Sequence, residues 1–181
     1  MNRRRFLAAA MLAGLPLNAL AHTPYRQWKV FRQRYLLITT SRTDLAGDAL
    51  GDRFAEILLA ELPQSRAMVS RAINLERIAS LITTDQANIA VLDHASAAAL
   101  ARGEAPFADY GPFPLQVIVQ TESHRLVCRE DVPLHHGYMI AGALMDHAAV
   151  LGIRIPGSGD DMPVHPGAAA FARGETIEAP Q

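Results

Sequence analysis

Two short polar stretches of this 181-residue chain carry the side chains best suited to hold a ligand. The first runs from Thr39 to Asp44 and supplies hydroxyls, one guanidinium and a helix-capping carboxylate. The second begins at Asp93 and adds a histidine and a serine. An arginine can hold a carboxylate through two parallel hydrogen bonds, and an aspartate can orient that arginine or accept an amine. The two stretches together predict a site for a small organic anion.

The candidate ligand-binding residues all belong to these two turns. They are Thr40, Ser41, Arg42, Thr43, Asp93, His94 and Ser96. An alternative interpretation stays open, in which Arg42 and Asp93 are a solvated pair and the hydroxyls satisfy backbone groups.

The first turn is predicted to join a buried strand to an amphipathic helix. The strand is the apolar run at 36–38, which is typical of a parallel sheet. Apolar residues then recur with helical spacing until Pro63 ends the helix; they are Leu50, Phe54, Ile57, Leu58 and Leu62. The first amides of such a helix point over the carboxyl end of the strand, where they favour an anion.

The remaining elements follow the same alternation of strand and helix. Further strands are expected at 67–70 and 88–92, and helices at 74–82 and 94–102, with Asn74 as a cap and Gly103 as a stop. This order predicts an α/β three-layer sandwich with a mostly parallel sheet. Two more strands at 115–120 and 124–128 are expected to form a hairpin at a sheet edge, followed by a helix from Pro133 to about Leu151.

The first 21 residues have the features of a removable export signal. Three arginines precede an apolar run that is too short to hold a bilayer, and Ala19-Leu20-Ala21 is a small-x-small cleavage pattern. The string Asn-Arg-Arg-Arg-Phe-Leu from Asn2 resembles a twin-arginine signal, with a general secretory signal as the alternative. We therefore expect a periplasmic protein, cleaved after Ala21.

Four regions are expected from the composition: the signal peptide (1–21), a basic and aromatic segment (22–34), a single α/β domain (35–155) and a C-terminal tail (156–181). Because the signal holds three of the 17 basic residues and none of the 18 acidic ones, the remainder is acidic, which argues against nucleic-acid binding.

Chemical motifs of common enzymes are missing from the chain. There is no Gly-x-Ser-x-Gly, and the single cysteine, Cys128, excludes both an internal disulfide and a Cys-x-x-Cys pair. We expect Cys128 to be a buried strand residue. The seven histidines do not show a chelating spacing. We therefore expect a protein that is not an enzyme and that has no metal site and no cofactor.

Three stretches resemble the TAXI-type solute-binding proteins of TRAP transporters, which have a type II periplasmic binding protein fold. They are the strand, Thr-Thr-Ser turn and helix at 36–59, the helix, linker and strand at 74–93, and His-Pro-Gly-Ala at 165–168. That family has two α/β lobes, whereas this chain is expected to have only one. The first ligand loop of that family is also glycine-rich, whereas the corresponding turn of this chain carries Arg42, Thr43 and Asp44.

The resemblance implies a periplasmic protein that binds a small organic anion, such as a carboxylate, in support of transport or sensing. A membrane transporter would then be a partner. The alternative is an accessory protein without a transport role, in which the degenerate lobe docks on a periplasmic or membrane protein through its exposed cleft face and residues 25–34. A homodimer could rebuild a cleft from two lobes.

Overall fold

The computed structural model describes residues 35–157 and 159–177. The expected signal peptide, the basic and aromatic segment at 22–34, Ser158 and the last four residues lie outside this part of the chain. None of the described helices combines the length and apolar character needed to cross a membrane.

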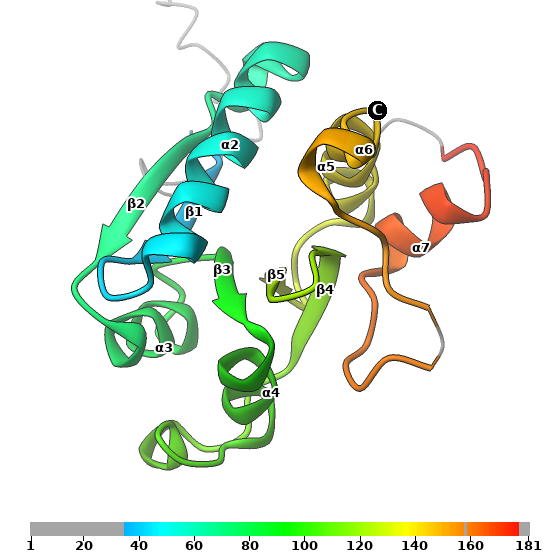
Figure 1. The fold of residues 1–181 in the computed structure, drawn as a ribbon. Helices are drawn as coiled ribbons and strands as arrows, with labels where there is room; N and C mark the ends of the chain where they lie inside the picture. Colours follow the sequence, from blue (N-terminus) through cyan, green and yellow to red (C-terminus); the bar gives the residue numbers. More distant parts are fainter. Residues whose placement is uncertain (1–34, 158, 178–181) are drawn as a thin grey trace, which may run out of the picture. The chain divides into compact units, whose positions relative to one another are not determined.

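A five-stranded mixed sheet forms the centre of the described chain (Figure 1). Its strand order is β2-β1-β3-β5-β4. The strands are β1 (Leu37–Ser41), β2 (Met68–Ala72), β3 (Ile89–Asp93), β4 (Leu115–Gln120) and β5 (His124–Arg129). The expected strands and the expected hairpin are therefore confirmed. Most boundaries differ by one or two residues, but β1 continues three residues past the expected strand at 36–38, so Thr39, Thr40 and Ser41 belong to the strand and not to the turn.

The sheet is only partly parallel, which corrects the expectation of a mostly parallel one. β1 pairs in parallel with β2 and with β3, whereas β5 is antiparallel to both β3 and β4. The physical reason is the short connection at 121–123, because a three-residue turn can join only antiparallel strands. The hairpin also turns inward, so that β5 lies between β3 and β4.

Helices pack on both faces of the sheet, as a three-layer α/β arrangement requires. One apolar core joins the sheet to α2 (Leu45–Glu61), α5 (Leu134–Met145) and α7 (Pro166–Ala172). The other joins it to α3 (Leu75–Thr83) and α4 (His94–Arg102). Val91 and Leu126 contribute to the first core, and Leu92 and Val127 to the second, because successive strand residues point to opposite faces.

The helix expected from Pro133 to about Leu151 is two helices, α5 and α6 (Ala148–Leu151). The amide of His147 donates to the carbonyl oxygen of Leu144, three residues earlier, at 3.1 Å, and this 3-10 turn ends α5. Cys128 is fully buried on β5, as expected, and burial raises the pKa of its thiol.

The His-Pro-Gly-Ala stretch fastens α7 against α5 (Figure 1). His165 is buried and caps α7, with its Nδ1 accepting a hydrogen bond from the Gly167 amide at 3.1 Å. Its Nε2 lies 3.0 Å from the carbonyl oxygen of Val132, just before α5, and donates to it. The stretch therefore has a clear packing role, whatever its relation to a protein family.

Candidate functional site

The two turns singled out from the sequence lie at the same edge of the sheet. β1 and β3 are direct neighbours, with Ile38 opposite Ile89, and both run toward this edge. The turns that follow Ser41 and Asp93 therefore lie side by side. This is the carboxyl edge of the parallel strands, where open α/β sheets commonly bind ligands.

Most polar groups of the first turn are already engaged within the fold. Thr40 is buried and donates a hydrogen bond of 2.6 Å to the carboxylate of Asp48. The hydroxyls of Ser41 and Thr43 lie 2.7 Å apart, and the Ser41 hydroxyl also accepts from the Thr43 amide. Arg42 is exposed and forms no ion pair within the described part of the chain.

The side chains of Asp93 and His94 in the second stretch are also hydrogen-bonded within the fold. Asp93 caps α4 by accepting from the Ser96 amide at 2.9 Å. His94 directs its Nε2 to the carbonyl oxygen of Thr121 at 3.1 Å. Burial opposes ionisation of Asp93, but hydrogen bonds from Ser96 and Ala95 outweigh it and hold the pKa of this carboxyl below its usual value.

A residue missing from the sequence-based set, His124, connects the elements at this edge. It is buried at the start of β5, opposite Asp93. Its Nε2 donates to the carboxylate of Asp44 at 2.9 Å, while the other oxygen of that carboxylate accepts from the Gly47 amide and caps α2. In the neutral ring this leaves Nδ1 to accept from the Ser123 hydroxyl at 2.8 Å. Asp44 thus has two roles, of which only the cap has a signature in the sequence.

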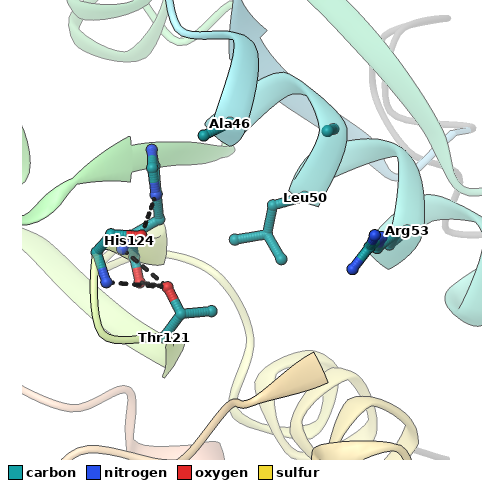
Figure 2. A pocket seen from close by; sticks show the side chains of 7 residues that line it. Ala46, Leu50, Arg53, Thr121 and His124 are labelled. Carbon is teal, nitrogen blue, oxygen red and sulfur yellow. Dashed lines mark hydrogen bonds between the residues drawn. The ribbon is translucent and has the colours of Figure 1, made fainter. Parts of the chain in front are cut away.

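An open pocket of about 250 Å³ lies between α2 and the β4–β5 turn (Figure 2). Its polar side comes from the β4–β5 turn and its apolar side from one face of α2; the lining residues are Ala46, Ala49, Leu50, Arg53, Thr121, Ser123 and His124. Gly47 permits this arrangement, because a Cβ there would lie 3.1 Å from the His124 ring and 2.4 Å from the Asp44 carboxylate.

Arg53 is the only arginine that lines this pocket. Its side chain is exposed and forms no hydrogen bond or ion pair with any described residue. Arg71, by contrast, reaches from β2 to α2 and pairs with both Asp48 and Asp52. Arg53 therefore brings an unpaired positive charge to a pocket that also has an apolar surface, whereas the hydroxyls of Thr121 and Ser123 are used in hydrogen bonds to His124.

None of the seven residues predicted from the sequence lines the pocket. They lie at the adjoining edge of the sheet, where Asp44 of the first turn bonds to His124, and His94 bonds to the backbone of Thr121 and Ser123. Arg53 could have been noticed from the sequence, since it falls three residues after Leu50 on the same helix face. The contribution of the β4–β5 turn has no such signal.

Within residues 35–157 and 159–177, no group of His, Cys, Asp and Glu side chains is arranged to hold a metal ion. No protein-family model matches the chain, and no curated protein matches it.

Proposed function

We propose that this protein binds a small organic anion, such as a carboxylate with a short apolar part, in the pocket between α2 and the β4–β5 turn. The single observation that carries the proposal is the unpaired guanidinium of Arg53 in that pocket. Arg53 would hold the carboxylate, and Leu50 would receive the apolar part. The role we propose is solute binding in support of transport or sensing.

Binding is tested with the variant Arg53→Ala in a thermal-shift panel of short carboxylates and amino acids. A ligand at a hundred times its dissociation constant stabilises a protein by about 2.7 kcal/mol, which is a shift of several degrees. We expect one class of carboxylate to stabilise the unmodified protein and to lose at least about tenfold in affinity with Arg53→Ala.

The matched control is Arg102→Ala, which removes an exposed helix arginine at the opposite end of the sheet, where it pairs only with exposed Glu104. This variant should keep the full ligand response. Equal responses of the two variants would remove Arg53 from the site. A second variant, Arg42→Ala, tests the turn predicted from the sequence in the same titration.

A second candidate function is docking on a partner protein. It is favoured by exposed apolar side chains at the carboxyl edge, where Leu45 is 79% and Ile73 66% exposed. If these side chains form a continuous apolar patch, that patch can mark an interaction site. A flat ligand panel, with the protein's mass recorded in the same samples, would favour docking over solute binding, and a doubled mass would identify the partner as a second copy.

The same proposal places the protein in the periplasm, because residues 1–21 resemble a twin-arginine export signal. If this route is used, replacing Arg3 and Arg4 with lysine should leave the precursor uncleaved in the cytoplasm. The measurement is cell fractionation with mass determination of the N-terminus, which should begin at His22 in the unmodified protein. Unchanged cleavage of the variant would indicate the general secretory route, and an uncleaved parent chain would contradict export.

A further inference from the structure

Arg125 is a buried cation on the opposite side of the sheet from the pocket. It follows His124 on β5, and neighbouring strand residues point to opposite faces. His124 therefore faces α2, whereas Arg125 faces the layer of α3 and α4. Its side chain is only 4% exposed. A guanidinium withdrawn from water in this way needs an anionic partner, because an unpaired buried charge is strongly unfavourable.

That partner is the carboxylate of Asp161, which differs sharply from Arg125 in its exposure. Both terminal nitrogens of Arg125 donate to Asp161, one of them at 3.4 Å and the other at closer range. The Arg125 Nε donates to the side-chain oxygen of Gln120 at 3.1 Å. The Asp161 side chain, however, is 53% exposed. Asp161 can return to water at small cost, whereas Arg125 cannot.

Asp161 lies on a loop whose two ends are paired with β4. Arg154, at the start of the loop, pairs with Gln120, and Val164, at its end, pairs with Val117. Asp160 is fastened separately, through Arg154 and the Gln120 amide. The ion pair of Asp161 is therefore not needed to hold the ends of this loop in place.

The surroundings of Asp161 favour an anion from more than one side. The hydrogen bond from Arg125 lowers the pKa of this carboxyl most strongly, and the charge of His94 lowers it further. His94 is the first residue of α4, so the Asp161 carboxylate lies near the carboxyl end of β3. At this edge of the sheet, the buried guanidinium of Arg125 therefore presents two nitrogen donors to a carboxylate.

We propose that Arg125 anchors a second carboxylate-binding site, which Asp161 occupies as an internal ligand. A small external carboxylate competes with Asp161 for the guanidinium and releases it to solvent. In the intact protein the tethered Asp161 has the advantage of a high effective concentration. Binding of an external carboxylate is therefore weak until Asp161 is displaced or removed. This site is independent of the pocket at Arg53, since the two lie on opposite faces of the sheet.

The test is chemical rescue of Asp161→Ala by formate and acetate, followed as the unfolding temperature. In chloride alone the variant should unfold several degrees below the parent protein, because Arg125 is left without its partner. Formate or acetate at matched ionic strength should restore the lost temperature with saturation. The parent protein should need at least about tenfold more anion for any comparable response. If Asp161→Ala does not fold in chloride, refolding yield with and without formate gives the same comparison.

Two controls separate this site from general salt effects and from the pocket. The double variant Arg125→Gln with Asp161→Ala should lose the rescue, because it lacks the guanidinium. Arg53→Ala with Asp161→Ala should keep it. An absent or unsaturable rescue, equal responses of the parent and of Asp161→Ala, or rescue that persists without Arg125 would each overturn the proposal and leave Arg125–Asp161 as a structural ion pair. None of these results depends on whether the pocket at Arg53 binds a ligand.

Discussion

Replacing Gly167 with alanine is expected to lower the free energy of unfolding by about 3 kcal/mol or more, or to prevent folding altogether. A Cβ at this position would lie 2.0 Å from the carbonyl oxygen of Leu134 and 2.5 Å from the amide nitrogen of Tyr138. Both are backbone atoms of α5, so no change of side-chain conformation can relieve the clash. The helices would have to separate, and the core around Ala168 and Ile140 would open with them.

The measurement is denaturant unfolding of Gly167→Ala beside the matched variant Gly157→Ala. A Cβ at Gly157 would meet nothing within 4 Å, and this glycine does not use the left-handed backbone region. Gly157→Ala should therefore unfold like the parent protein or be slightly more stable, because alanine restricts the unfolded chain. Similar stabilities of the two variants would mean that α5 and α7 are not in close contact in solution.

Lowering the pH from 7 to 5 is expected to destabilise the protein through His136 and His165. Burial lowers the pKa of His136 to about 4, with the charges of His135 and His165 acting in the same direction. Burial also lowers the pKa of His165, against a raising effect of its hydrogen bond to Val132. In the unfolded chain both imidazoles have a pKa near the ordinary value of about 6.5.

The sign of the effect follows from these directions. Above pH 7 the two histidines are neutral in the folded and the unfolded chain, and their contribution to stability is fully present. As the pH falls below about 6.5, the unfolded chain takes up protons that the folded chain does not, so the free energy of unfolding decreases. Between pH 7 and 5 we expect a loss of about 2 kcal/mol from His136, with a further loss from His165.

Denaturant unfolding at pH 7, 6 and 5 measures this dependence. The variant His136→Gln should flatten it, because glutamine does not titrate. The control is Val150→Ala, which changes an exposed side chain of α6, leaves every titratable group in place and should leave the slope as it is. A slope that is unaffected by His136→Gln would show that other groups cause the acid sensitivity.

Local signals in the sequence determined the elements of this fold. Asn74 caps α3 and Gly103 ends α4 in the left-handed conformation, both as predicted, whereas Asp93, predicted as a ligand-binding residue, is the cap of α4. The hairpin was predicted from two apolar runs and a short polar connection between them. Such signals depend on residues within a few positions of each other, which is why sequence patterns can reveal them.

The placement of β5 was not determined by any local signal. A hairpin at the sheet edge can join β3 through either of its two strands with the same sequence pattern, because the alternation of side chains along a strand does not identify the neighbouring strand. Only the pairing of Ile89 with Cys128 through to Asp93 with His124 decides that β5 is central. The sheet is mixed because the short connection at 121–123 makes β4 and β5 antiparallel, although the first three strands are parallel.

The candidate sites depend even more on tertiary structure. The sequence identified the two polar turns, and the fold does bring them to one edge, but it also uses most of their groups for caps and internal hydrogen bonds. Arg53, whose side chain has no ion-pair partner among the described residues, meets a turn about 70 residues away along the chain, and Arg125 meets Asp161 at a separation of 36 residues. Residue types thus determined which side chains could bind an anion. Only the packing of α2 and of the chain after β5 against the sheet decided which of these side chains lack a partner. Ion pairs and hydrogen bonds between side chains depend on distances in the folded protein, and residues far apart in the sequence can form them.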